Sequence, residues 1–455
     1  MTALAYPHTW SMTPSRQPIH GVARVPGSKS LTNRCLILAA LADPAAGSHS
    51  IIENALAAED VQLLFGALTQ LGIPITASAD GTQLTIPATL RDRWARSGDF
   101  HCGNSGTTLR FLTALLALGQ GSYRLDGIAR MRERPVADLL DGLTQLGTRA
   151  WSETGNGCPP LRLEAQGLHG GRAEVRGSVS SQFLSALLMA APLADGPETV
   201  LDVLPPLISE PYVDMTLRCV AEAGGVIYRE TGSQSGGIAF RIPGRQHHRP
   251  RTWHIEPDAS AASNFLAAAA VTGGRVEIAG LSADSRQGAA RFVDVLEAMG
   301  CTVSRQPLAV TGGPLHGTEV DLGGMSDTLM TLAAVALFAS GPTSIRNVAH
   351  VRRKESDRLA ALATELRKLG ADLGERGDGL TIRPAPLHGA HLQTYKDHRL
   401  AMAFALIALR VPGVVVDDPG CVAKTFPGYF VELKRLCEPR SEGAPPAEEL
   451  AAAAR

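Results

Sequence analysis

Residues 27–44 read GSKSLTNRCLILAALADP, a short polar turn followed by a helix-length apolar run that ends at a proline. The pattern occurs six times along the chain, and the later copies lie roughly 70 to 80 residues apart, a longer period than that of familiar solenoid repeats. These later copies begin at Gly103 (GNSGTTLRFLTALLALGQG), Gly177 (GSVSSQFLSALLMAAPLADG), Pro257 (PDASAASNFLAAAAVTGG), Gly324 (GMSDTLMTLAAVALFASG) and Tyr395 (YKDHRLAMAFALIALRVPG).

A second, amphipathic helix is predicted between successive copies, and it often closes with Leu-Gly or Met-Gly. The clearest example ends at Gly370, and its apolar face is formed by Leu359, Leu362, Leu366 and Leu369. Segments such as 320–322 (VDL) and 414–416 (VVV) are short and β-prone. Each repeat therefore reads as strands with one buried and one half-exposed helix, which predicts an α/β fold.

The polar turn before each apolar run is the candidate functional part of the repeat. A helix that is apolar on nearly every side must be surrounded by protein, so its N-terminal turn is the end that can reach a cleft. Unpaired N–H groups and a partial positive charge suit that turn to anions, although helix capping alone explains any single copy. Six turns that also carry charged side chains favour an anion site; these side chains are Lys29, Arg34, Arg110, Asp327 and Arg399.

Composition limits the class of protein. The 455 residues are 44% apolar and 19% charged, which predicts a globular protein of two or three domains. A formal net charge of -1 argues against a generally cationic nucleic-acid or membrane binder. Seven scattered cysteines without a C-x-x-C pair, no signal-peptide pattern in residues 1–17 and no membrane-length apolar run predict a cytoplasmic location. We expect residues 438–455 to be a disordered tail.

Common cofactor motifs do not stand out. The Gly-Ser-Lys-Ser turn at Lys29 lacks the full spacing of a nucleotide-binding P-loop. No metalloprotease, serine-hydrolase or dinucleotide signature stands out, so we predict chemistry with neither a metal nor an organic cofactor. Cations near predicted helix starts, with Asp327 and Glu355 among them, indicate a heavily anionic substrate. These cations are Lys29, Arg34, Arg110, Arg130, Lys354, Arg358, Arg399 and Lys424.

Eight short motifs in order resemble those of the 5-enolpyruvylshikimate-3-phosphate (EPSP) synthases, and together they extend from about Pro18 to Cys437. They are residues 26–30 (PGSKS) with Asn33-Arg34, 103–107 (GNSGT), 130–135 (RMRERP), 177–182 (GSVSSQ), 209–212 (SEPY), 354–358 (KESDR), 397–399 (DHR) and 424–427 (KTFP).

The resemblance implies the enolpyruvyl transferase fold, an inside-out α/β barrel of two similar domains, each with three βαβαββ repeats around buried helices. We expect the first domain at 28–255 and the second at 1–27 with 256–437. It also implies transfer of the enolpyruvyl group of phosphoenolpyruvate to the 5-hydroxyl of shikimate 3-phosphate, with release of phosphate. The implied partners are these two small molecules, with no nucleic acid, membrane or cofactor, and the implied state is a monomer.

Matching motifs carry the family's site residues onto this chain. Those implied to hold shikimate 3-phosphate are Lys29, Ser30, Arg34, Ser180, Ser181, Gln182, Ser209, Asp327 and Lys354. Those implied to surround phosphoenolpyruvate are Lys29, Gly106, Arg130, Gln182, Arg358, Arg399 and Lys424. The reaction needs a base and an acid, for which we predict Asp327 and Glu355, with Lys29 stabilising charge. From the residues alone, Asp327 could equally cap a helix, and Glu355 could form an exposed ion pair with Lys354 or Arg358.

Three further positions bear on the pocket. Phe111 stands where many relatives have Pro or Leu, and His350 stands at a site that is often Asn. Gly106 is the small residue usual in glyphosate-sensitive relatives, so we predict sensitivity to glyphosate.

Two rival functions remain. One is a UDP-N-acetylglucosamine enolpyruvyl transferase, which typically uses a loop cysteine, a role for which Cys102 and Cys158 are poor matches. The other is a non-catalytic anion-binding repeat protein.

Overall fold

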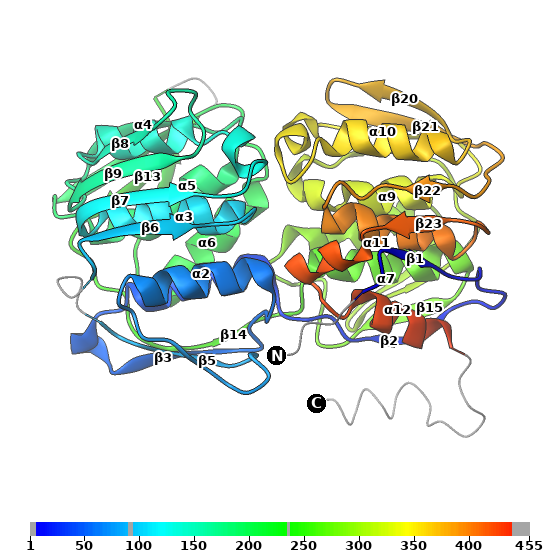
Figure 1. Cartoon of the computed structure of the whole chain (residues 1–455), viewed down its shortest axis with the longest axis horizontal. Helices are drawn as coiled ribbons and strands as arrows, with labels where there is room; N and C mark the ends of the chain where they lie inside the picture. Colours follow the sequence, from blue (N-terminus) through cyan, green and yellow to red (C-terminus); the bar gives the residue numbers. More distant parts are fainter. Residues whose placement is uncertain (1–5, 90–93, 234–236, 439–455) are drawn as a thin grey trace. The chain divides into compact units, whose positions relative to one another are not determined.

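The computed structural model describes residues 6–89, 94–233 and 237–438. These residues form two compact units, which we name unit 1 (the described residues of 27–255) and unit 2 (6–26 with 256–438). The disorder expected for the tail concerns residues that, apart from Glu438, lie outside the described ranges. In Figure 1 unit 1 runs from the blue helix α2 to the green strand β14, whereas the green elements α7 and β15, the yellow-to-red part and the blue strands β1 and β2 belong to unit 2.

The described residues of unit 1 form three open four-stranded sheets. Their strand orders are β14-β3-β5-β4, β6-β7-β9-β8 and β10-β11-β13-β12. The strands are β3 (His49–Glu53), β4 (Thr76–Ala77), β5 (Leu84–Pro87), β6 (Ser97–His101), β7 (Gln120–Asp126), β8 (Arg149–Ser152), β9 (Leu161–Gln166), β10 (Gly171–Arg176), β11 (Glu198–Leu204), β12 (Tyr228–Thr231), β13 (Ile238–Pro243) and β14 (Thr252–His254). In each sheet the first two strands are parallel and the other pairs are antiparallel.

The helices of unit 1 alternate between buried and amphipathic. The buried ones are α1 (Lys29–Ala40), α3 (Gly106–Ala117) and α5 (Ser181–Ala190), and they contact one another in the core. The amphipathic ones are α2 (Glu59–Gln70), α4 (Ala137–Gln145) and α6 (Glu210–Glu222). Each buried helix is preceded by a serine whose hydroxyl accepts a backbone N–H of the first turn, so the polar turns cap the helices as the sequence predicts.

The described residues of unit 2 repeat this plan, except that one of the three sheets has three strands instead of four. Its sheet orders are β16-β17-β15-β2, β18-β19-β21-β20 and β1-β23-β22. The strands are β1 (Thr9–Ser11), β2 (His20–Ala23), β15 (Arg275–Ile278), β16 (Thr302–Arg305), β17 (Leu308–Thr311), β18 (Glu319–Asp321), β19 (Thr343–Arg346), β20 (Asp372–Arg376), β21 (Gly379–Arg383), β22 (His391–Leu392) and β23 (Val415–Asp417). The helices are α7 (Ala259–Thr272), α8 (Phe292–Ala298), α9 (Leu329–Ala336), α10 (Arg358–Lys368), α11 (His398–Ala408) and α12 (Tyr429–Cys437).

Sequence periodicity predicts these elements well. The four leucines expected on one face of α10 are each at most 1% exposed, and Gly370 follows the helix with a left-handed φ of 85°. The helices α7, α9 and α11 are buried almost along their whole length. The predicted α/β fold of βαβαββ repeats is confirmed, and the described sheets are open rather than closed into barrels.

Two strands pair with partners that are distant in the sequence. β14 pairs in parallel with β3, at the opposite end of the unit 1 segment, and β2 pairs in parallel with β15 of unit 2. The chain crosses between the units at 26–27 and at 255–256, so unit 2 is completed by an N-terminal segment that precedes unit 1. At one crossing, a Cβ on Gly27 would overlap the carbonyl oxygen of Asn54, so the close backbone approach requires glycine. The assignment of the two units as the predicted functional domains remains a prediction.

Candidate functional site

Lys29 is the first residue of α1, and its ammonium group pairs with a buried carboxylate. Its Nζ lies 3.0 Å from Oδ2 of Asp60, whose side chain is 1% exposed. Asp60 belongs to the first turn of α2, where its carboxylate also suits the positive end of the helix. Sequence reasoning missed Asp60, although the pattern contains a signal: an acidic residue there shares the buried face of α2 with Leu64 and Leu68.

Arg34 lies inside unit 1 rather than at its surface. Its guanidinium donates to Oγ1 of Thr216 at 2.7 Å, the carbonyl oxygen of Ser30 at 2.9 Å, the carbonyl oxygen of Tyr212 at 3.1 Å and Oγ of Ser185 at 3.2 Å. Burial lowers its pKa to about 10. The side chain thus ties α1 to α5 and α6, and its role as a substrate ligand remains a prediction.

Phe111 has a structural explanation in the same region. Its ring is 1% exposed, and the guanidinium carbon of Arg34 lies 5.2 Å from its centroid. A stacked aromatic ring stabilises a buried guanidinium through a cation–π interaction. Phe111, which stands where many relatives have Pro or Leu, therefore stabilises the buried guanidinium of Arg34.

Gly106 begins α3 in a crowded environment of two guanidinium groups. An added Cβ would lie 2.7 Å from Nη1 of Arg110 and closer still to Nη2 of Arg134. Arg110 donates to Oε1 of Gln182 at 2.6 Å and to the carbonyl oxygen of Pro135 at 3.1 Å, which links α3 to the 177–182 and 130–135 motif segments. Arg134 donates to the carbonyl oxygen of Asn104 at 2.9 Å; the sequence reasoning did not single it out, although it lies inside the RMRERP motif.

The remaining predicted residues of unit 1 lie at helix starts and in one loop. Ser180 caps α5, and Ser181 and Gln182 are the first two residues of that helix. Ser209 precedes α6 with a left-handed φ of 52°, a conformation that costs a non-glycine residue energy. Arg130 lies beside the short 3-10 helix η3 (Met131–Glu133), with its Nη1 2.7 Å from Oε2 of Glu133.

Asp327 is the centre of a charge cluster in unit 2. It lies in the 3-10 helix η6 (Gly323–Thr328), which precedes α9. Its carboxylate oxygens lie 2.7 Å from Nζ of Lys354, 2.9 Å from Nη2 of Arg399 and 3.1 Å from Nη1 of Arg358. Burial would raise the pKa of Asp327, but the three positive charges outweigh it and hold the pKa well below its usual value.

Arg358 is the most enclosed member of this cluster, with a side chain that is 1% exposed. Besides Asp327, it contacts Glu355 at 2.9 Å and Asp397 at 2.8 Å. Burial would lower the pKa of Arg358, but the charges of Asp397, Glu355 and Asp327 outweigh it and raise the pKa. Glu355 is 8% exposed, so the ion pair expected as its alternative role exists with Arg358 but is buried.

Asp397 connects two predicted ligands of phosphoenolpyruvate. It binds Arg358 through both carboxylate oxygens, at 2.8 and 3.2 Å, and it caps α11 by accepting the backbone N–H of Arg399 at 3.1 Å. The sequence reasoning quoted the Asp-His-Arg motif but assigned Asp397 no role. Lys424, at the end of the 3-10 helix η8 (Pro419–Lys424), is 4% exposed.

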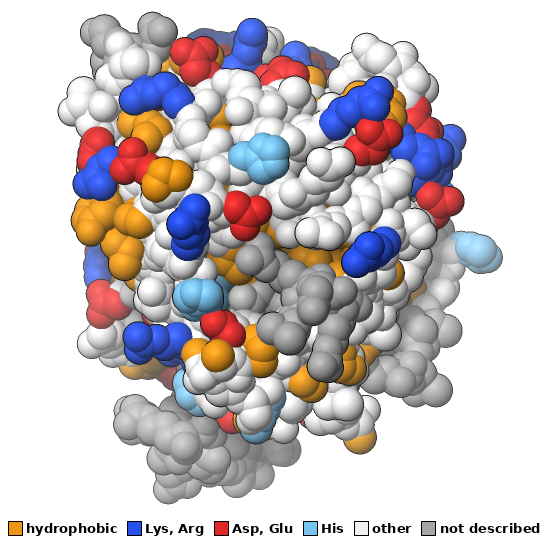
Figure 2. All heavy atoms as spheres, turned by 90° about the vertical axis from the view of Figure 1, so that its left-hand side faces the viewer, with side chains coloured by type: hydrophobic (Ala, Val, Ile, Leu, Met, Phe, Trp, Pro, Cys, Tyr) orange, Lys and Arg blue, Asp and Glu red, His pale blue; other side chains and the backbone are white. Residues whose placement is uncertain are grey.

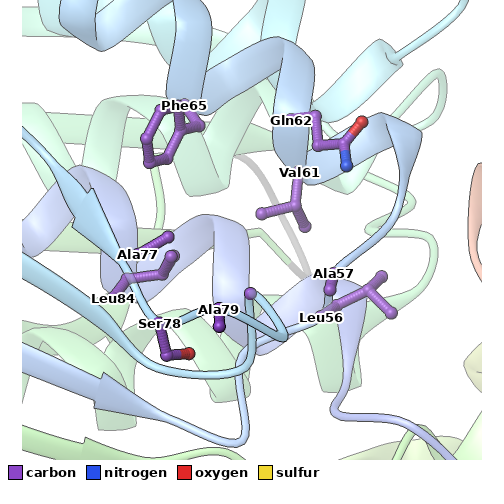
Figure 3. A pocket seen from close by; sticks show the side chains of 10 residues that line it. Leu56, Ala57, Val61, Gln62, Phe65, Ala77, Ser78, Ala79 and Leu84 are labelled. Atoms are coloured by element: carbon purple, nitrogen blue, oxygen red, sulfur yellow. The ribbon is translucent and has the colours of Figure 1, made fainter. Parts of the chain in front are cut away.

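An apolar cavity in unit 1 lies apart from these charged groups. It has a volume of about 280 Å³ between α2 and the β4–β5 hairpin, and Figure 3 shows Phe65, Val61 and Leu84 lining it. Gln62 and Ser78 are the polar side chains of its lining, so it offers no charge to an anion. On the face shown in Figure 2, the coloured positive and negative side chains are interspersed, without the broad basic patch of a nucleic-acid binder.

A reactive cysteine is not found at Cys102. Its side chain is fully buried, and burial, followed by the charge of Asp126, raises the pKa of its thiol to about 12. A thiol with so high a pKa is a poor nucleophile at neutral pH. This disfavours Cys102 as the loop cysteine of a nucleotide-sugar transferase.

Solved structures identify the fold of this chain. An EPSP synthase from Acinetobacter baumannii superposes with a TM-score of 0.75 at 23% identity, covering 94% of this chain and 98% of the other. The enolpyruvyl transferase NikO from Streptomyces tendae superposes with a TM-score of 0.73 at 22% identity, covering 93% and 96%. The chain therefore has the enolpyruvyl transferase fold.

Sequence comparison identifies the family. The family described as EPSP synthase (3-phosphoshikimate 1-carboxyvinyltransferase) matches residues 14–433. The 3-phosphoshikimate 1-carboxyvinyltransferase of Nostoc punctiforme is 45% identical over 93% of this chain and 97% of its own length. The chloroplastic enzyme of the same name from Arabidopsis thaliana is 42% identical over 92% and 82%. This chain belongs to the EPSP synthase family.

No helix in its described part is long and apolar enough to cross a membrane.

Proposed function

We propose that this chain transfers the enolpyruvyl group of phosphoenolpyruvate to the 5-hydroxyl of shikimate 3-phosphate and releases inorganic phosphate. The observation that carries the proposal is the cluster in which Asp327 contacts Lys354, Arg358 and Arg399. It combines a carboxylate for proton transfer with cations for carboxylate and phosphate groups. The proposed setting is a cytoplasmic monomer that acts on small molecules without a metal or organic cofactor.

The reaction proceeds by addition and then elimination. The substrate hydroxyl oxygen forms a bond to C2 of phosphoenolpyruvate and loses its proton to a base, while C3 gains a proton from an acid and becomes a methyl group. The tetrahedral adduct then loses phosphate from C2 and a proton from that methyl group, which regenerates the vinyl group as an enol ether. We assign the base to Asp327 and the acid to Glu355, and Lys29 stabilises the developing charge.

The ion pairs in the unliganded cluster suggest how Asp327 becomes a base. A carboxylate held by three cations has a low pKa and takes up a proton poorly. Anionic substrates compete for Lys354, Arg358 and Arg399, and each cation they take over weakens the hold on Asp327. Substrate binding thereby raises the basicity of Asp327 at the time when the hydroxyl must lose its proton.

The test is release of inorganic phosphate from phosphoenolpyruvate, with and without shikimate 3-phosphate, in wild type and Asp327→Asn. We expect release that requires both substrates and falls by about 10²- to 10⁴-fold in the variant, the usual contribution of a general base. Asp372→Asn is the matched control, because Asp372 pairs with Arg383 at 3.2 Å on the surface of the same unit. A folded wild type that releases no phosphate with both substrates refutes the function, and full activity of Asp327→Asn refutes the assignment of the base.

A further inference from the structure

A hydrogen-bonded chain of three side chains lies beside Asp327. Nζ of Lys354 donates to Oγ of Ser326 at 3.2 Å, and Oγ of Ser326 lies 2.8 Å from Nε2 of His350. Ser326 is fully buried and His350 is half-buried, so the contact is shielded from bulk water. Lys354 is also the residue whose ammonium group lies 2.7 Å from Asp327.

The backbone fixes both ends of this chain. His350 lies in the 3-10 helix η7 (Ala349–Arg353), which is anchored by the fully buried side chains of Val348 and Val351. The backbone N–H of Val348 donates to the carbonyl oxygen of Asp378 at 2.9 Å, and that of Lys354 to the carbonyl oxygen of Val351 at 3.3 Å. The backbone on either side of His350 is therefore held by buried neighbours and backbone hydrogen bonds, whereas the Lys354 side chain has four rotatable bonds to restrain.

The chemistry of the groups determines the direction of the hydrogen bonds. An ammonium group can only donate, so Oγ of Ser326 accepts from Lys354. The hydroxyl proton of Ser326 is then available to Nε2 of His350, which accepts it when the imidazole is neutral and carries its proton on Nδ1.

The charges around His350 favour the neutral ring. Lys354 and Arg358 face it with positive charge, and Asp327 opposes them with negative charge. Burial, followed by the charge of Lys354, lowers the pKa of His350 to about 3. The imidazole therefore remains an acceptor throughout the neutral pH range.

We propose that His350 and Ser326 are positioning residues that hold the ammonium group of Lys354 in place for shikimate 3-phosphate, the imidazole acting through the serine hydroxyl. The proposal rests on the ligand role assigned to Lys354 above. It goes beyond that role by giving His350 a function in this chain that requires an acceptor nitrogen.

The first test is a double-mutant cycle on steady-state kinetics with Ser326→Ala, His350→Ala and the double variant. A hydrogen bond to a charged group typically contributes enough for about a 10- to 100-fold change, so we expect the KM for shikimate 3-phosphate to rise by that factor in Ser326→Ala. His350→Ala should raise the same KM, and the double variant should be no worse than Ser326→Ala, because the two residues act in series. The KM for phosphoenolpyruvate should change by less than about threefold, since Arg358 and Arg399 keep their own partners.

Two variants separate positioning from general damage to the fold. His350→Gln can place an amide oxygen near the position of Nε2, and it should restore the KM to within about threefold of wild type. His316→Ala is the matched control, because His316 forms a comparable bond from Nδ1 to Oγ of Ser340 at 3.2 Å on an exposed part of the same unit. It should leave both KM values unchanged.

The second test does not depend on catalysis. Long-range ¹H–¹⁵N NMR of the wild-type protein, with His350→Ala for assignment, should show a neutral His350 with its proton on Nδ1 at pH 6. An imidazolium or a proton on Nε2 overturns the proposal, as do additive effects in the cycle or failure of His350→Gln to restore the KM. Inactive wild-type protein would instead refute the proposed function, and the NMR result would still decide whether the hydrogen-bonded chain exists.

Discussion

Replacement of Asp397 by asparagine should destabilise unit 2 through the loss of one buried charge. The Asp397 side chain is 0% exposed, and its carboxylate accepts from Nε and Nη2 of Arg358, from Oγ of Ser356 and from the backbone N–H of Arg399. Asparagine preserves the shape and one acceptor oxygen, so the helix cap can survive. The negative charge beside a guanidinium that is 1% exposed is lost.

The magnitude follows from the balance of charge in the cluster. Three cations, Lys354, Arg358 and Arg399, face three carboxylates, Asp327, Glu355 and Asp397. Breaking a buried ion pair by removing one partner costs about 3–5 kcal/mol. Because Arg358 retains two carboxylates, we expect the lower end, about 3 kcal/mol, which corresponds to a fall in Tm of roughly 6–12 °C for a body of about 200 residues.

The assay is urea unfolding followed by a probe specific to unit 2, together with the Tm. The control is Asp372→Asn, the same chemical change in an Asp–Arg pair whose side chains are 55% and 48% exposed, and it should cost less than about 1 kcal/mol. In the kinetic assay, Asp397→Asn should also raise the KM for phosphoenolpyruvate, since it releases Arg358 and weakens the start of α11. A midpoint shift no larger than that of Asp372→Asn, at unchanged m, would refute the idea that Asp397 stabilises this cluster.

Three further outcomes are expected. Gly106→Ala should raise the KM for phosphoenolpyruvate and weaken inhibition by glyphosate, because the new methyl group must displace the guanidinium groups beside it; inhibition curves of both proteins test this, and identical curves contradict it. Asp60→Asn should lower kcat in a variant that remains folded, because Lys29 loses the charge that positions its ammonium group. A kcat equal to that of wild type counts against this role. The pKa of Asp327 is lower in the folded than in the unfolded protein, so its carboxylate contributes stability above the unfolded pKa, and this stability is lost as the pH falls through the folded pKa. Urea midpoints between about pH 5 and pH 2 should therefore fall less steeply in Asp327→Asn than in wild type. Parallel curves would exclude this contribution.

The sequence alone determined the repeated architecture and the chemical character of the site. An apolar run with a capped polar start specifies a buried helix through local propensity and patterning, and six such runs predict the α/β repeats that the structure contains. Cations and acids in ordered motifs, from Lys29 to Lys424, were sufficient to indicate anionic substrates and to suggest the family.

Only the tertiary structure decided which charges meet and what each one does. The ion pairs of Lys29 with Asp60 and of Arg358 with Asp397 join residues 31 and 39 positions apart, and no local rule fixes such pairs. The enclosure of Arg34 by α5 and α6 has the same origin. So does the pairing of β14 with β3 and of β2 with β15, because strand partners are chosen by the complementary surfaces they bury rather than by either strand's own sequence.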